Sequence, residues 1–316
     1  MTVFEQLIIL VRYGIWGVAP DVISCNQDTW RELLLLAVEH SVQGHLYDAA
    51  RRLPSSCGCP QEVLSSLERC AHVLEAGSRR LSAVADRQAE TWRRHGINAV
   101  EIKGRNTAAL YPVPEHRSWG DVDWWMPSDD DWDKSLAVVR ANGISPETDS
   151  DGDISYQLGG VAVEHHRKGL EAEGPEGMLL LLNRHLMHHA MGAGAGLRQV
   201  LDLAVALDRY AGQYDRETYL RLLASRRMLR WNSVAEELAM HLRDGRPLSR
   251  RARALYDLVA ADGNFGFRKY RRFGGLLRRT LFFLAVAPGP YVRHWSGLVT
   301  GRLRRETKVR NVSSDN

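Results

Sequence analysis

The sequence is poor in cysteine, and its few cysteines do not form a metal-binding pattern. There are four, at Cys25, Cys57, Cys59 and Cys70. Cys57 and Cys59 have one residue between them, whereas the cysteine pairs of zinc sites usually have about two to four. The pattern therefore argues against a zinc finger and favours reduced thiols, which are typical of a cytoplasmic protein.

The sequence also lacks a long apolar run. Residues 281–287 are apolar, but a helix that crosses a bilayer needs about 20 such residues. Because arginines flank this stretch, it could form a helix on a membrane surface, although a buried helix is the interpretation that we prefer. Residues 1–20 are interrupted by Glu5 and Arg12 and have no basic start, so the sequence does not predict a signal peptide.

Acidic residues are scarce near the carboxyl-terminal end. The net charge of the chain is +4, and residues 268–310 supply most of the excess, with Glu306 as their one acidic residue. This basic segment is a candidate for contact with an anionic partner, nucleic acid or an anionic membrane surface. The alternative, which we prefer, is a solvated pair of basic helices beside a polyanionic nucleotide site. No recognised nucleic-acid module accompanies the segment, which argues against polymerisation or tRNA modification.

Composition and patterning divide the 316 residues into three parts. Residues 1–95 are predicted to be helical, because a capping box at Thr29 opens one helix to about residue 52 and Pro60 opens another to about residue 94. Residues 96–170 mix strands with helices. Residues 171–316 begin with a linker at 171–177 and continue as a helical domain with a basic tail. Its helices are expected at 178–191, 197–210, 216–225, 230–242 and 249–260.

A strand followed by a glycine turn is the first half of a candidate site. Residues 97–102 are predicted to form a buried strand that ends at Lys103 and Gly104, and a short helix is expected to follow at residues 105–110. A helix amino terminus after a glycine turn suits phosphate, because its N–H groups are free and its dipole is positive there. Gly104 would let the backbone approach a triphosphate closely, and Lys103 and Arg117 would add positive charge.

Two carboxylates form the second half of the candidate site. Asp121 and Asp123 are two residues apart in a predicted strand, so their side chains point to the same face. Two acids on one face can share a pair of divalent cations. Such a pair is the clamp used for in-line phosphoryl and nucleotidyl displacement.

A predicted hairpin supplies a third carboxylate. Strands are expected at residues 154–158 and 161–166, joined by the two-residue turn Gly159-Gly160. Along the second strand, Glu164 and His166 face one way and His165 faces the other. Glu164 can therefore complete an acid triad with the two aspartates if this strand lies beside theirs.

Polar residues recur on the helices that follow. His185, His188 and His189 share one face of a predicted helix. Histidines at this spacing can bind zinc, but no further ligand motif accompanies them, so we prefer a polar face turned toward the cleft. Arg198 and Asp202 are one helical turn apart and could pair, contact phosphate or hold an acceptor.

The order of these motifs resembles that of a known superfamily. Lys-Gly, Tyr-Pro, Arg-x-x-x-Asp-Val-Asp and Val-Glu-His-His follow one another, as in the nucleotidyltransferases of the DNA polymerase β fold. More narrowly, the chain resembles an uncharacterised bacterial branch whose turn reads Lys-Gly in place of Gly-Ser. The resemblance covers about residues 28–210. It implies an α+β class, with a polymerase-β-like palm (a mixed sheet with helices) at residues 96–170 between amino- and carboxyl-terminal helical segments.

The resemblance also implies an activity and roles for individual residues. The expected reaction moves a nucleoside monophosphate from a nucleoside triphosphate, such as ATP, to a hydroxyl of a small molecule or to a peptide or protein side chain. Phosphoryl transfer is a variant that the same site would support. The expected catalytic residues and ligands of Mg²⁺ or Mn²⁺ are Asp121, Asp123 and Glu164. The expected nucleotide-binding residues are Lys103, Gly104 and Arg117, and the acceptor-side candidates are His166, His185, Arg198 and Asp202.

A second hypothesis belongs to another class of protein. The palm could be a non-catalytic nucleotide-binding or scaffolding module whose basic carboxyl-terminal region contacts a partner or a membrane. The intact acid triad argues against this hypothesis. The missing serine of the Gly-Ser turn, whose hydroxyl usually helps to hold a phosphate, leaves it open.

Overall fold

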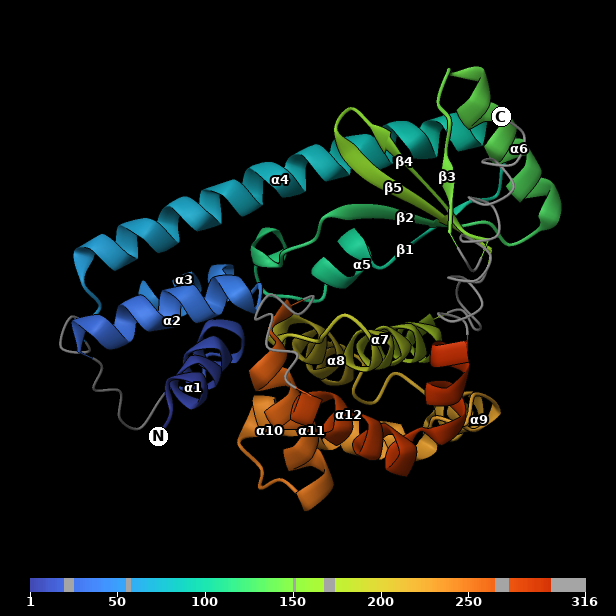
Figure 1. Ribbon diagram of the computed structural model, residues 1–316. Helices are drawn as coiled ribbons and strands as arrows, with labels where there is room; N and C mark the ends of the chain where they lie inside the picture. The colour runs from blue at the N-terminus through green and yellow to red at the C-terminus, as the bar shows by residue number, and fades with distance from the viewer. Residues whose placement is uncertain (20–25, 55–57, 150–151, 168–173, 265–272, 297–316) are drawn as a thin grey trace, which may run out of the picture.

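A five-stranded mixed sheet lies between two sets of helices (Figure 1). The computed structural model describes residues 1–19, 26–54, 58–149, 152–167, 174–264 and 273–296. The expected α+β class is confirmed. The tail arginines Arg302, Arg304 and Arg305 lie outside the described residues, as do Cys25 and Cys57.

The amino-terminal region contains three short helices and one long one. They are α1 (Val3–Trp16), α2 (Gln27–Glu39), α3 (Gln43–Ala50) and α4 (Gln61–Arg94). The prediction of one helix from Thr29 to about residue 52 was wrong, because the chain breaks between α2 and α3 at Ser41, whose φ is 57°. At this break the ring nitrogen Nδ1 of His40 accepts a hydrogen bond from the backbone N–H of Leu197 at 3.2 Å. His40 at this break thus caps the helix that begins at Leu197, far along the chain.

The sheet has the order β1-β2-β5-β4-β3. Its strands are β1 (Val100–Ile102), β2 (Asp121–Trp125), β3 (Glu147–Thr148), β4 (Ile154–Leu158) and β5 (Val161–His166). β2 and β5 run parallel, and the other neighbours are antiparallel. The predicted hairpin is confirmed with its bounds, whereas β3 was not expected and β1 is shorter than the predicted strand at 97–102.

Three short elements connect the strands. They are α5 (Gly104–Ala108), the 3₁₀ helix η2 (Pro114–His116) and α6 (Asp129–Ala141). The hydroxyl of Ser128 accepts a hydrogen bond from the backbone N–H of Asp131 and caps α6, as the sequence predicts. α4 and α6 cover the sheet face that carries Trp124 and His165, which leaves the other face of the sheet for the candidate site.

The carboxyl-terminal region is helical throughout its described part. Its helices are α7 (Gly174–Met191), α8 (Leu197–Arg209), α9 (Arg216–Ser225), α10 (Leu229–Asp244), α11 (Arg250–Asp262) and α12 (Phe273–Val286). Residues 288–296 are also helical. The five predicted helices are found, with ends that differ by a few residues. α7 begins inside the predicted linker at 171–177. None of the described helices is both long and apolar enough to cross a membrane.

Two hydrophobic cores hold the chain together. The first joins α1, α2 and α3 to the carboxyl-terminal helices, and the second joins the sheet to α6. α4 contributes to both: Val63 and Leu67 belong to the first core, whereas Val84 and Trp92 belong to the second. The two end regions that the sequence separates into 1–95 and 171–316 therefore pack together as one helical body, and α4 connects this body to the sheet (Figure 1).

The expected burial of residues 281–287 is only half correct. Phe282 and Phe283 lie in the first core, but Leu281 and Leu284 are 60% and 46% exposed. The reason is that α12 is apolar on two faces and only one of them packs against the helical body.

The close contact between α1 and α3 yields a stability prediction. A Cβ atom added at Gly14 would lie 2.1 Å from the backbone oxygen of His45, so Gly14→Ala should lower the free energy of unfolding by about 1–3 kcal/mol through overpacking. The matched control is Gly77→Ala in α4, where nothing lies within 4 Å and alanine should stabilise by about 0.5–1 kcal/mol. Urea unfolding followed by circular dichroism measures both, and equal effects would contradict the packing argument.

Candidate active site

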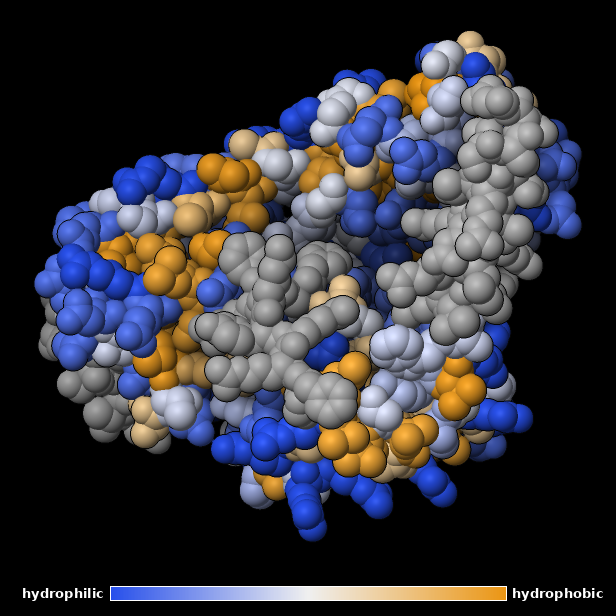
Figure 2. All heavy atoms as spheres, viewed as in Figure 1, coloured by the Kyte–Doolittle hydropathy of each residue, from blue (hydrophilic) through white to orange (hydrophobic). Residues whose placement is uncertain are grey.

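The parallel pairing of β2 with β5 brings the predicted acids together. Asp123 lies directly opposite Glu164, and Asp121 lies opposite Ala162 on the same face of β2. The predicted parity holds, because His165 is fully buried against Ser135 and Tyr156 on the opposite face of the sheet. The face that carries the acids is turned toward the helical body. In Figure 2 hydrophilic residues line the hollow between the sheet and that body.

The turn after β1 aims a lysine at the acids. Lys103 has a φ of 57° and a ψ of −134°, a backbone conformation that costs a non-glycine residue on the order of 1–3 kcal/mol. Its Nζ lies 2.9 Å from Oδ1 of Asp123. Gly104 follows with a φ of 37°, and a Cβ atom there would lie 2.9 Å from the ring of Trp119. The turn therefore requires glycine at this position. The strained backbone of Lys103 directs its ammonium group into the site.

His166 connects two carboxylates. Its Nε2 lies 2.8 Å from Oδ1 of Asp123 and 3.6 Å from Oε2 of Glu164, and its Nδ1 lies 2.8 Å from Oδ2 of Asp153. Asp153 was not among the predicted site residues. The register of the hairpin could have predicted its position. Ile154 pairs with His165, and one further step along the same register places Asp153 opposite His166.

A divalent cation fits this arrangement of side chains. Ligand atoms of Asp123, Glu164 and His166 all lie within 4.8 Å of one another. Carboxylate oxygens and an imidazole nitrogen are common ligands of Mg²⁺ and Mn²⁺ or of softer divalent ions. Asp121 is outside this converging group but shares the strand face of Asp123. The role of the predicted triad Asp121, Asp123 and Glu164 as the metal ligands stays a prediction.

Burial and like charge raise the pKa values of two of the acids. Burial raises the pKa of Asp121, and the negative charge of Asp123 adds to the increase. Burial also raises the pKa of Glu164, and Asp123 and Asp121 contribute further. Glu164 is therefore a stronger base than an ordinary carboxylate, which suits a residue that accepts a proton.

Two cations dominate the environment of Asp123. Burial raises the pKa of the Asp123 carboxyl, but the positive charges of Lys103 and His166 outweigh burial and the pKa falls below its ordinary value. Burial disfavours the charged form of His166, yet its hydrogen bonds to Asp123 and Asp153 prevail and raise its pKa to about 9. At neutral pH His166 is thus an imidazolium that donates to both carboxylates.

Arg117 does not lie beside the acids as a free cation. Its Nε and Nη2 donate to Asp202 at 2.7 and 2.8 Å, and its Nη1 donates to the backbone oxygen of Gly104 at 3.3 Å. The hydroxyl of Tyr111 donates to the same carboxylate at 2.8 Å. Arg117 and Asp202 are 3% and 1% exposed. In this geometry Arg117 fixes the Lys-Gly turn to α8. Its direct contact with a phosphate stays a prediction.

The remaining acceptor-side candidates come from α7 and α8. The Nε2 atoms of His185 and His189 are 2.8 Å apart, and Nη1 of Arg198 donates to the backbone oxygen of Ser118 at 3.1 Å. Burial lowers the pKa values of both histidines, followed by the neighbouring histidine and by the charges of Lys103 and Arg198. These helices therefore place neutral imidazoles and a guanidinium beside the acid cluster. Their contact with an acceptor stays a prediction.

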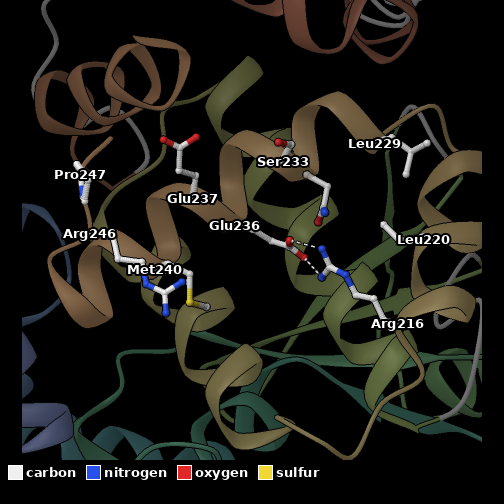
Figure 3. Close-up of a pocket in the computed structure, with 10 residues that line it drawn as sticks. Arg216, Leu220, Leu229, Ser233, Glu236, Glu237, Met240, Arg246 and Pro247 are labelled. Atoms are coloured by element: carbon white, nitrogen blue, oxygen red, sulfur yellow. Dashed lines mark hydrogen bonds and ion pairs between the residues drawn. The ribbon is translucent and has the colours of Figure 1, made fainter. Parts of the chain in front are cut away.

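A separate hollow in the helical body has a different character. It measures about 370 Å³ and is lined by α9, α10 and the residues after α10 (Figure 3). Arg216 donates to both oxygens of Glu236 there at 2.7 and 2.8 Å, and Glu237 accepts from the hydroxyl of Ser249 at 2.8 Å. These charged groups satisfy one another, and none of the lining residues comes from the sheet. The acid cluster is therefore the better candidate for chemistry.

One comparison with known proteins finds a match. Residues 26–175 match a family model described as an uncharacterised nucleotidyltransferase. The matched segment begins just before α2 and ends in the first turn of α7, so it contains the Lys-Gly turn and the acid cluster. α8, which carries Arg198 and Asp202, lies outside it. Comparisons with curated proteins and with solved structures give no match.

The buried ion pair yields a prediction about Arg117. Arg117→Met leaves Asp202 as an uncompensated buried charge, so it should lower the free energy of unfolding by about 3–5 kcal/mol. The double variant Arg117→Met with Asp202→Leu should recover much of this loss. Arg31→Met removes an exposed partner of Glu62 and should leave stability nearly unchanged. Urea unfolding measures all three. A single Arg117 variant of normal stability that binds nucleotide poorly would instead favour direct phosphate contact.

Proposed function

We propose that this enzyme moves a nucleoside monophosphate from a nucleoside triphosphate to a hydroxyl group, because residues 26–175 match the model of an uncharacterised nucleotidyltransferase family. The acceptor that we propose is a small molecule or a peptide or protein side chain. The observation that carries the proposal is the placement of Asp123 opposite Glu164 with the Lys103 ammonium group 2.9 Å from Asp123. A cytoplasmic location is also part of the proposal.

Divalent cations are part of the proposal, and Mg²⁺ or Mn²⁺ suits the oxygen-rich ligands. Asp121, Asp123 and Glu164 would hold them. His166 would become a further ligand if the bound cation displaced a proton from its ring. When bound, such cations neutralise a triphosphate and stabilise the attacking and leaving oxygens of an in-line displacement. Asp153 would then act as a positioning residue, because its carboxylate holds the His166 ring toward Asp123.

The proposed reaction assigns a task to each side chain. The acceptor hydroxyl oxygen forms a bond to the α-phosphorus, and the bond from this phosphorus to the oxygen that bridges to the β-phosphate breaks. Pyrophosphate leaves with the electrons of that bond. Glu164 accepts the hydroxyl proton, because its raised pKa makes it a stronger base than an ordinary carboxylate. Lys103 and Gly104 would contact the leaving phosphates, since the ammonium group and the close backbone approach both favour negative charge.

The acceptor would approach from the helical body. His185 and Arg198 belong to α7 and α8, which face the acids across the hollow. We propose that they contact the acceptor, as does His166 if it is released from Asp123. Asp202 has a different task in this proposal, because its two oxygens already accept hydrogen bonds from Arg117 and Tyr111. Asp202 therefore positions the site through Arg117.

Nucleotide binding should depend on the cation and on the paired aspartates. Asp121→Asn with Asp123→Asn removes two carboxylates from the proposed metal site and should weaken Mg²⁺- or Mn²⁺-dependent binding of ATP or GTP at least about tenfold, or 1.4 kcal/mol. The control is Asp133→Asn on the exposed side of α6, which should bind as the wild type does. Isothermal titration calorimetry with and without the cation measures both. Unchanged affinity in the folded double variant would refute the metal assignment.

The position of a radioactive label should identify the group that is transferred. With nucleotide labelled at the α-phosphate, label should pass to hydroxyl-bearing acceptors from a test panel while pyrophosphate is released. With nucleotide labelled at the γ-phosphate, the acceptors should stay unlabelled. Glu164→Gln should abolish the transfer and keep nucleotide binding, because the amide cannot accept the proton.

Two other results would lead to different conclusions. Transfer of the γ-label would identify a phosphotransferase. Cation-dependent binding without any transfer or pyrophosphate release would favour the non-catalytic nucleotide-binding module, for which the altered Gly-Ser turn is the supporting observation.

A further inference from the structure

An exposed apolar stripe runs along the last described helices. Leu277, Leu281 and Leu284 of α12 are 52%, 60% and 46% exposed, and they follow one another at steps of four and three residues. The same spacing continues through Pro288 to Val292 and Trp295 in the helix at residues 288–296, where Val292 is 59% and Trp295 38% exposed. Within one helix, steps of three and four residues place side chains on one face. The three leucines therefore share a face of α12, and Val292 and Trp295 share a face of the helix at residues 288–296. Figure 2 shows hydrophobic residues gathered over α12 at the lower edge of the molecule.

The opposite face of these helices is apolar as well. Phe283 stacks on Trp231 with ring centroids 5.6 Å apart and on Tyr291 at 5.5 Å. Phe282 and Val286 are also buried in the helical body. The inner face therefore explains the folding of α12, but not its outer leucines. Contiguous exposed apolar surface is typical of a protein or membrane interaction site, so the outer stripe indicates a partner.

The charge around the stripe indicates the kind of partner. The sequence has no aspartate or glutamate between Asp262 and Glu306. Arg278 and Arg293 are exposed beside the stripe, whereas Arg279 is held by Asp262 at 2.5 Å and belongs to the fold. A surface that joins leucines and a tryptophan with unopposed arginines matches an anionic lipid bilayer, whose acyl region accepts the leucines and whose headgroups attract the arginines. Nucleic acid would satisfy the arginines but would leave the leucines exposed.

We propose that α12 and residues 288–296 form a docking surface that lies on an anionic lipid bilayer. Leu277, Leu281 and Leu284 enter the boundary between headgroups and acyl chains. Arg278 and Arg293 contact the headgroups, and Trp295 lies at the interface, where its amphipathic ring is favoured. This inference is independent of the proposed nucleotidyl transfer.

The docking surface also touches α7, the helix that carries the acceptor-side candidate His185. The rings of His294 and His188 lie 5.4 Å apart, and Nη1 of Arg279 donates to the backbone oxygen of Gly192 at 3.1 Å. His188 belongs to α7, as do His185 and His189. A membrane-bound molecule would therefore place α7 close to the bilayer surface.

Vesicle co-sedimentation of the full chain tests the proposal. The probes are vesicles of phosphatidylcholine alone and of phosphatidylcholine mixed with phosphatidylglycerol. The wild type should bind the anionic vesicles, and binding should weaken as salt is added. Leu281→Glu with Leu284→Glu should weaken binding at least about tenfold. Because both leucines face solvent, this variant should keep the wild-type circular dichroism spectrum and ATP affinity.

A matched pair on another helix provides the control. Leu35 and Val38 of α2 are 64% and 42% exposed and have the same three-residue separation as Leu281 and Leu284. Leu35→Glu with Val38→Glu should leave vesicle binding unchanged. Arg278→Glu with Arg293→Glu should remove the preference for anionic vesicles.

Three results would overturn the proposal. The first is the absence of binding to anionic vesicles, and the second is equal binding of the wild type and the Leu281/Leu284 variant. The third is a dimer of the wild type that this variant converts to monomers without any vesicle binding, since the stripe would then be covered by a second copy of the chain.

Discussion

The buried ion pair between Arg117 and Asp202 is the contact on which the geometry of the candidate site depends. Arg117 follows η2 and Asp202 belongs to α8, so the pair joins the segment before β2 to the helical body. A third nitrogen of the same guanidinium donates to the backbone oxygen of Gly104, which ties the strained Lys-Gly turn to the same anchor. An isolated buried charge costs several kcal/mol, whereas a bidentate pair with a further donor from Tyr111 satisfies both partners. One pair thus sets the position of the Lys103 backbone relative to α8.

The sequence predicts what depends on neighbours along the chain and misses what depends on distant ones. Alternation in β5 was enough to separate Glu164 from His165, and the Gly159-Gly160 turn was enough to define the hairpin. The partner of Arg117 is 85 residues away, and no local pattern distinguishes an arginine that binds phosphate from one that is held by a buried carboxylate. The break at Ser41 was missed for the same reason, because the group that His40 caps lies at Leu197.

Asp123 shows how the site balances its charges. Lys103 and His166 both approach Oδ1 of this carboxylate, at 2.9 and 2.8 Å, and both remain protonated at neutral pH. Glu164 has a more distant cation, His166 at 3.6 Å, and for Asp121 the described structure gives no ion pair. Burial and repulsion by Asp123 raise the pKa values of both. The three acids are therefore not equivalent: Asp123 stays an anion, whereas Asp121 and Glu164 take up a proton more readily. This difference argues against Asp123 as the base.

The two hydrophobic cores divide the molecule into a helical body and a sheet. This division does not follow the order of the chain. α1–α3 pack with α7–α12 in one core, which forms the helical body. His185, Arg198 and Asp202 belong to this body, whereas the Lys-Gly turn and the acids belong to the sheet. The candidate site lies where the two meet. α7 has the site on one side and is contacted by the 288–296 helix through the His188 and His294 rings. If the stripe on α12 lies on a bilayer, the body that carries the acceptor-side residues is the part held at the membrane, and the sheet with its acids is held over it by α4 and by the Arg117–Asp202 pair.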